Sequence, residues 1–205
     1  MRKVNCKRLD SERIYMILRK SISAGLAISI GCIAFLSVGG GALGAFLFSI
    51  GLILVCVREM DLFTGKVCYV RRWDSKWKIL IILTGNLVAA IGMGLAMARV
   101  KPILAHSARE LCETKLEEGL LVIPLGILCN IMIYFAVDTF YSGIRGLIVV
   151  LCVMVFITCG FEHCIANAFY LALGGTLFTY DGILYLILNI FGNAIGGIAI
   201  RQLCG

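Results

Sequence analysis

Long apolar runs separated by short charged stretches make up most of this chain. The sequence is 60% hydrophobic and 15% charged, with a mean hydropathy of +0.98, which is far from the composition of a soluble globular domain. One helical crossing of a bilayer takes about 20 apolar residues, so the 205 residues provide about six membrane-spanning helices and no sizeable soluble domain. We therefore expect an all-α, multi-pass membrane protein.

Charge gives the expected orientation in the membrane. The spans are expected at residues 21–38, 42–57, 79–98, 119–137, 146–178 and 182–200. Residues 1–20 form a basic segment without the pattern of a cleavable signal, and residues 66–78 and Arg201 add further positive charge. Because short cytoplasmic loops are rich in Lys and Arg, both termini are predicted to lie in the cytoplasm of a cell. The net charge of +7 is thereby assigned to orientation in the lipid bilayer and not to nucleic acid.

The ten cysteines do not indicate a disulfide framework or a metal site. Six of them fall inside expected spans, where a thiol behaves as a small apolar side chain: Cys32, Cys56, Cys129, Cys152, Cys159 and Cys164. The chain has no CxxC and no Cys/His metal spacing. A thiol or redox enzyme is a weak alternative, and the absence of cofactor motifs and nucleophile–base patterns predicts no enzyme and no cofactor.

Charged residues interrupt two of the apolar segments. Glu162 and His163 lie in a segment that is otherwise apolar from 147 to 178. An ionisable side chain is tolerated there only if it faces a partner or a watery cavity. Residues 58–66 hold four charged side chains and are either a solvated loop or a break in a span that resumes at 67–70. The apolar stub at 67–70 favours the break.

The two interrupted segments form an internal repeat. Residues 59–66 align without gaps over residues 160–167, which places Asp61 in register with Glu162. The Gly85-Asn86 pair likewise aligns with Gly192-Asn193. Each half, about 21–100 and about 119–205, therefore has three spans with a broken second one. Because three is odd, the halves enter the membrane from opposite sides, and both breaks are expected to line one pore near the midplane.

At these positions the sequence resembles the formate/nitrite transporter family. The resemblance rests on an ordered set of motifs along nearly the whole chain: Phe48-Ser49-Ile50-Gly51-Leu52, Asp61-Leu62-Phe63-Thr64-Gly65, Gly85-Asn86-Leu87-Val88, Cys112-Glu113-Thr114-Lys115, Leu128-Cys129-Asn130, Tyr141-Ser142-Gly143, residues 160–167 and residues 192–197. It implies a homopentamer of aquaporin-like protomers, each with its own pore for small monovalent anions such as formate, nitrite, lactate-like acids or hydrosulfide.

The resemblance also implies roles for individual residues. His163 corresponds to the family's central pore histidine, and Thr64 to the threonine of the gating loop that faces it. Leu62 and Phe63 would help to close the pore. The other pathway positions are Phe48, Leu52 and Phe156 in a cytoplasmic constriction, Ile133 in an outer one, and Lys115 as a source of positive potential. The polar framework positions are Glu162, Asn130, Asn167, Asn193 and Asn86.

The polar residues of the second break can be given separate roles. We expect Glu162 to orient the break through backbone hydrogen bonds, Asn167 to satisfy freed backbone groups, and His163 alone to meet substrate. Structural alternatives stay open: His163 bonding a carbonyl, Thr64 capping the resumed helix, and Lys115 as a solvated residue. The chain departs from the family pattern at Glu59-Met60, at Lys66 and in a short turn after 141–143.

The leading functional hypothesis is a proton-linked channel for small weak-acid anions. A small anion faces a large desolvation cost in an apolar constriction, and a proton taken directly from His163 or through water would let it cross as a neutral acid. A passive channel for small neutral solutes is the alternative. Flux that is unaffected by loss of the ionisable group at His163 would favour that alternative.

Overall fold

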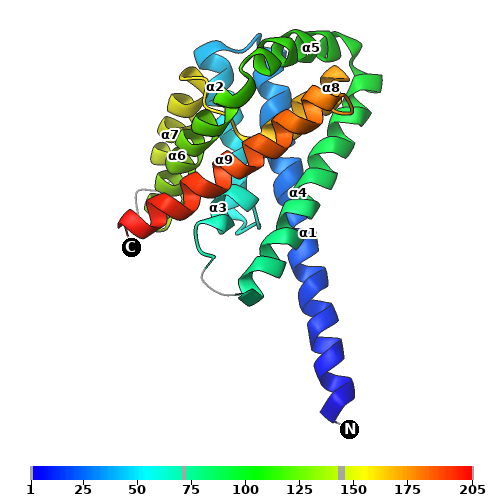
Figure 1. The fold of residues 1–205 in the computed structure, drawn as a ribbon, viewed down its shortest axis with the longest axis vertical. Coiled ribbons are helices and arrows are strands. Elements are labelled where there is room, and N and C mark those ends of the chain that lie inside the picture. Colours follow the sequence, from blue (N-terminus) through cyan, green and yellow to red (C-terminus); the bar gives the residue numbers. More distant parts are fainter. Residues whose placement is uncertain (1, 71–72, 143–145, 205) are drawn as a thin grey trace.

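The computed structural model describes the backbone of residues 2–70, 73–142 and 146–204, and the side chains of residues 11–70, 76–141 and 146–204 (Figure 1). Within these residues every regular element is helical, in the order α1 (Arg2–Ser37), α2 (Gly41–Val57), α3 (Phe63–Val67), α4 (Trp73–Val100), α5 (Pro102–Glu117), the short 3₁₀ helix η1 (Gly119–Leu121), α6 (Val122–Ser142), α7 (Leu147–Thr158), α8 (Cys164–Gly174) and α9 (Tyr180–Cys204). The expected all-α class is confirmed.

Four helical segments of the described chain are long and apolar enough to cross a membrane: Ser11–Ser37, Lys76–Val100, Gly119–Tyr141 and Tyr180–Cys204. The spans predicted at 21–38, 79–98, 119–137 and 182–200 coincide with them. Helix α1 runs without interruption through the boundary expected at residue 20, so the basic segment continues the first span.

The two remaining apolar segments are interrupted as predicted. Helix α2 ends at Val57 and α3 begins at Phe63, while α7 ends at Thr158 and α8 begins at Cys164. Asp61 in the first turn is only 6% exposed and Glu162 in the second only 1%, whereas Arg58 and Glu59 at the start of the first turn are exposed. The first interruption is therefore exposed where it begins and buried at Asp61, which rules out the solvated-loop interpretation for Asp61.

Close helix crossings hold the bundle together. Helix α6 packs along α9, and α1 packs along both α2 and α4. The α6–α9 crossing depends on glycine, since a Cβ at Gly196 would lie 2.3 Å from the carbonyl oxygen of Ile127. Small residues permit this approach, which brings the backbones of spanning helices together. The glycine spacing along the last span thus has a packing role.

Helix α5 lies across one end of the bundle, and both chain ends lie toward the opposite end (Figure 1). Sequence reasoning missed this helix, because it treated residues 99–118 as a region of mixed charge. The available signal was Pro102 at the first turn, with Leu104, Ala108 and Cys112 buried at intervals of one turn. The span expected at 119–137 is also too short at its end, because α6 continues to Ser142. Gly143, Arg71 and Arg72 lie outside the described residues.

Candidate functional site

The two helix breaks have the same backbone design. Each begins with a residue in the left-handed region, Glu59 at φ 48° and Gly160 at φ 69°. In each, the following N–H returns to the carbonyl five residues earlier: Met60 to Val55 at 2.9 Å and Phe161 to Phe156 at 2.8 Å. Glycine takes such a φ without strain, whereas Glu59 does not. The repeat alignment of residues 59–66 with 160–167 thus corresponds to matching local geometry.

An asparagine side chain holds the first break. Asn86 Oδ1 accepts the N–H of Phe63 at 2.7 Å, and Asn86 Nδ2 donates to the carbonyls of Asp61 at 3.0 Å and Ser21 at 2.7 Å. Asn86 is fully buried. Interrupting a helix frees backbone groups that cannot reach water at this depth. Asn86 satisfies two of them, at Phe63 and Asp61, and its bond to Ser21 ties α4 and the break to α1.

Asn193 holds the second break in the same way. Its Oδ1 accepts the N–H of Cys164 at 2.9 Å, and its Nδ2 donates to the carbonyls of Glu162 and Gly126, each at 2.8 Å. Phe63 aligns with Cys164 and Asp61 with Glu162, so the two asparagines bond equivalent backbone groups. The resemblance implied a framework role for both asparagines, and in the structure each side chain bonds two backbone groups of a break.

His163 and Thr64 meet where the two breaks face each other. His163 is 3% exposed and Thr64 is fully buried, with His163 Nε2 3.2 Å from Thr64 Oγ1. The other ring nitrogen, Nδ1, accepts the N–H of Ala166 at 3.2 Å and caps α8. A backbone N–H only donates, so Nδ1 carries no hydrogen in this arrangement. The ring is therefore neutral, with its hydrogen on Nε2, and Thr64 Oγ1 accepts it. Thr64 caps no helix.

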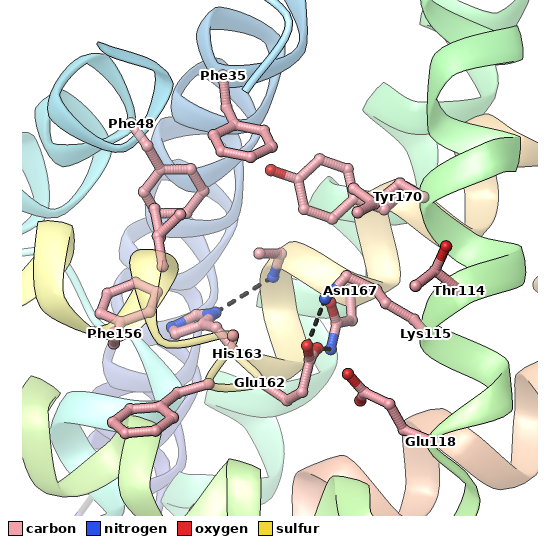
Figure 2. Close-up of a pocket in the computed structure, with 15 residues that line it drawn as sticks. Phe35, Phe48, Thr114, Lys115, Glu118, Phe156, Glu162, His163, Asn167 and Tyr170 are labelled. Atoms are coloured by element: carbon pink, nitrogen blue, oxygen red, sulfur yellow. Dashed lines mark hydrogen bonds and ion pairs between the residues drawn. The ribbon is translucent and has the colours of Figure 1, made fainter. Parts of the chain in front are cut away.

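A cavity of about 210 Å³, the α5 chamber, lies between the second break and α5. It is lined by Phe35, Phe48, Leu111, Thr114, Lys115, Glu118, Phe156, Ile157, Gly160, Phe161, Glu162, His163, Ala166, Asn167 and Tyr170. Figure 2 shows an aromatic wall beside His163. Phe156 stacks on the imidazole at a centroid distance of 6.2 Å, and Phe48 meets Phe156 edge-on at 6.1 Å.

A network of polar side chains holds the Glu162 carboxylate on the other side of His163. Lys115 Nζ donates to Glu162 Oε1, and Asn167 Nδ2 donates to Glu162 Oε2 at 2.6 Å (Figure 2). Asn167 Nδ2 also lies 2.7 Å from Asn189 Oδ1, and Asn189 Nδ2 donates to the Glu162 carbonyl at 2.8 Å. The side chain of Lys115 is only 14% exposed and its charge is compensated by Glu162.

This network corrects two expectations. The Glu162 carboxylate bonds side chains and not backbone groups, and Asn167 bonds Glu162 and Asn189 and not freed backbone groups. The backbone is satisfied instead by Asn189 and Asn193. Sequence reasoning missed Asn189. The available signal was a second asparagine four residues before Asn193, on the same face of an apolar helix.

Glu118 is a further residue of the α5 chamber that sequence reasoning missed. Tyr185 donates its hydroxyl hydrogen to Glu118 Oε2 at 3.0 Å. Burial is the main cause that raises the pKa of the Glu118 carboxyl, and the nearby charge of Glu162 adds to it. Lys115 and the Tyr185 hydroxyl act in the opposite direction. The charged residues lining this chamber are therefore one cation and two carboxylates.

A second cavity of about 140 Å³, the α3 chamber, lies on the other side of the breaks. It is lined by Val55, Cys56, Met60, Leu62, Gly65, Lys66, Tyr69, Val137 and Tyr141. Arg201, near the end of α9, lies 5.2 Å from the ring centroid of Tyr69. The α3 chamber is thus on the side of the chain termini, and the α5 chamber is on the opposite side.

The expected constriction of Phe48, Leu52 and Phe156 is not a single ring. Phe48 and Phe156 line the α5 chamber, while Leu52 is buried and lines neither chamber. The chain termini lie at the end of the bundle opposite to these phenylalanines (Figure 1). The predicted cytoplasmic constriction and the predicted cytoplasmic termini are therefore incompatible with each other. Among the residues expected to close the pore, Leu62 lies on the side of the chain termini, because it lines the α3 chamber.

Six further predicted residues line neither chamber: Thr64, Asn86 and Asn193, whose contacts are given above, and the three that follow. Phe63 is buried and supplies the N–H that Asn86 accepts, Ile133 is buried in α6, and Asn130 lies with its Nδ2 3.9 Å from Cys68 Sγ. Among the described residues, Asn130 Oδ1 has no hydrogen-bond partner. No group of three His, Cys, Asp or Glu residues that could hold a metal ion occurs in the part of the chain that the structure describes.

Two buried helix breaks that meet at one histidine, with a cavity on each side, define a multi-pass membrane protein of the channel and transporter class. Residues 2–204 match the family described as formate/nitrite transporter, and the chain belongs to that family.

Among curated relatives, the chain is 27% identical over 203 residues to the formate channel FocA of Haemophilus influenzae and 31% identical over 183 residues to that of Escherichia coli K12. These alignments cover 80% and 75% of this chain, and 68% and 64% of the relatives, so the chain spans about two thirds of their length.

Solved structures of similar fold include a pentameric formate channel with formate bound. That structure has a TM-score of 0.84 and 26% identity, with 94% of this chain and 96% of that one covered. An ion channel of the same family has a TM-score of 0.82 at 23% identity, with 96% and 91% covered, and shows the fold alone.

Proposed function

We propose that the protein is a channel for small monovalent weak-acid anions in the cytoplasmic membrane. Formate is the first candidate, with nitrite and hydrosulfide as the others. The observation that carries the proposal is the Nε2–H of His163, a buried hydrogen-bond donor placed with Thr64 between two cavities. Similarity to proteins described as formate channels supports formate as the substrate.

The proposed topology is six crossings in two inverted three-helix halves, with an aquaporin-like protomer. The four long helices supply four crossings, and the pairs α2–α3 and α7–α8 supply two broken ones. The matching bonds of Asn86 and Asn193 support a structural repeat. Both chain ends lie at one end of the bundle, as an even number of crossings requires (Figure 1). We place that end in the cytoplasm and propose a homopentamer, as the similar formate channel is described.

In the proposed mechanism His163 stays neutral and stabilises the anion before the anion takes up a proton. An imidazolium needs hydrogens on both nitrogens, which would break the bond between Nδ1 and the Ala166 N–H. The neutral ring offers its Nε2–H to an anion oxygen in place of Thr64 Oγ1. The proton then arrives through water in the chamber, and the neutral acid crosses the apolar side chains at low desolvation cost.

The test is uptake of formate, nitrite and hydrosulfide by proteoliposomes, with and without an inward proton gradient. We expect one anion to be preferred and its uptake to rise with the gradient, because protonation limits passage. Protein-free liposomes supply the background rate of the neutral acids. Equal uptake of urea or glycerol with no response to the gradient would instead identify a passive channel for neutral solutes.

Glu118 is expected to set part of the pH dependence. Its carboxylate opposes anion entry into the α5 chamber, and because its pKa is raised, that charge is lost earlier than usual as the pH falls. Glu118→Gln removes the charge and leaves an oxygen to accept from Tyr185. We expect uptake at pH 7 to rise about two- to five-fold, since one charge is removed at short range.

The control for this variant is Glu110→Gln. Glu110 lies on α5, which ends one residue before Glu118; its side chain is 69% exposed, and its ion-pair partner is His106 on the surface. Uptake by the control should match the wild type from pH 5 to pH 8. A Glu118→Gln profile that coincides with the wild type would show that this charge does not reach the anion.

A further inference from the structure

The α3 chamber contains a cation that the mechanism above does not use. Lys66, in the last turn of α3, lines this chamber with its side chain 41% exposed. It is the only charged side chain among the described residues that line the chamber. The α5 chamber differs, because there Lys115 faces the two carboxylates Glu118 and Glu162. The charged side chain that lines the α3 chamber is therefore a cation, whereas the α5 chamber also exposes two carboxylates.

Asp61 holds this cation in place. Lys66 Nζ lies 3.3 Å from Asp61 Oδ1, and the Asp61 side chain is only 8% exposed. The carboxylate is thus inside the protein while the ammonium reaches toward the cavity. An ammonium has three hydrogens to donate, and the contact with Asp61 uses one of them. The other hydrogens are available for an anion in the chamber.

The repeat shows what is particular about Lys66. In the second break, the aligned position is Asn167, which donates to the aligned carboxylate Glu162 at 2.6 Å. Glu162 obtains its opposite charge from Lys115 on α5. In the first break, Lys66 forms the ion pair with the Asp61 carboxylate and so supplies the opposite charge itself. A neutral asparagine could satisfy the carboxylate geometry here too, so the positive charge is available for another role.

We propose that Lys66 is a second anion-binding residue and forms a docking site for small monovalent anions in the α3 chamber. An anion entering from the side of the chain termini is drawn to the ammonium before it passes Leu62 toward His163. The proposal rests on the function proposed above. It adds a cation on the side of the molecule opposite to Lys115.

Lys66→Asn is the matched test, because it places at this position the residue found at the aligned one; it removes the positive charge and shortens the side chain. Initial rates of formate uptake are measured in right-side-out and inside-out membrane vesicles over a concentration series. We expect the half-saturating formate concentration to rise about three- to ten-fold when formate enters at the α3 chamber. Entry at the α5 chamber should be unchanged. Lys66→Arg should stay near the wild type, as should Lys78→Asn, which removes a lysine from α4 that lines neither chamber.

A second readout does not depend on transport. Tyr141 lines the α3 chamber and is 59% exposed, so a Tyr141→Cys reporter is accessible there in a background with Cys6, Cys56, Cys159 and Cys204 changed to serine. Its reaction rates with anionic and cationic methanethiosulfonate reagents give a ratio that reports the local potential. We expect Lys66→Asn to lower the anionic-to-cationic ratio about five-fold.

The two readouts separate the possible failures. An unchanged reagent ratio overturns the proposal whatever the uptake shows. A lower ratio with an unchanged half-saturating concentration on both faces also overturns it, because the charge would lie off the anion's path. Wild-type vesicles could take up no formate while Lys66→Asn still lowers the anionic-to-cationic reaction ratio. That result would contradict the proposed transport function but support the anion-attracting site at Lys66.

Discussion

Replacing His163 with asparagine is expected to reduce formate uptake about 10- to 100-fold and to abolish its rise with an inward proton gradient. A hydrogen bond to a charged group contributes about 1.5–3 kcal/mol, and the shorter asparagine cannot reach the position of Nε2. Asparagine is nevertheless a good N-cap, so its Oδ1 can accept the Ala166 N–H as Nδ1 does now. The variant should therefore fold.

The measurement is uptake into proteoliposomes at matched protein content, with thermal unfolding in detergent as the check on folding. Thr64→Ser is the companion variant, since it keeps a hydroxyl opposite Nε2 and should retain most of the flux. If His163→Asn folds and takes up formate like the wild type, with the same response to the gradient, the histidine is a structural cap and the pore is passive.

The second large effect concerns the ion pair between Lys115 and Glu162. Lys115→Met leaves a carboxylate whose side chain is 2% exposed without its cation. Removing one partner of a buried pair costs about 3–5 kcal/mol, so the melting temperature in detergent should fall sharply. Adding Glu162→Gln should restore most of the stability, because the glutamine is neutral and its oxygen can still accept from Asn167.

The double variant also separates structure from transport. Removing one positive and one negative charge leaves the net charge of the α5 chamber unchanged, so we expect uptake within about three-fold of the wild type. A stable double variant without uptake would show that the Lys115 ammonium itself contacts the anion. A single variant as stable as the wild type would contradict a buried ion pair.

The breaks could be predicted from the sequence because their signals are local. Glu162 and His163 stand out in an apolar segment, and the ungapped alignment of Asp61 with Glu162 indicates an equivalent first break. The Gly-Asn pairs then mark the asparagines that hold both breaks. Buried polar groups need partners, so each such residue in an apolar span already limits the possible structures.

The partners themselves could not be read from the sequence. Glu162 bonds Lys115, 47 residues earlier, and no local pattern connects the two. The same holds for Glu118 with Tyr185, and for Phe48 with Phe156, which meet across α2 and α7. Depth in the membrane follows from helix packing, so the sequence did not show that these phenylalanines lie at the end of the bundle opposite to the chain termini (Figure 1).

The asparagine clamps have a consequence for how fast the protein works. Because Asn86 and Asn193 tie both breaks to neighbouring helices by three hydrogen bonds each, the backbone around His163 has little freedom to rock between two arrangements. Opening then falls to rotations of side chains such as Phe48 and Leu62. Such rotations are far faster than collective domain motions, which occur in about microseconds to milliseconds. For the transport function proposed above, we therefore expect turnover in the range of a channel and not of an alternating-access carrier.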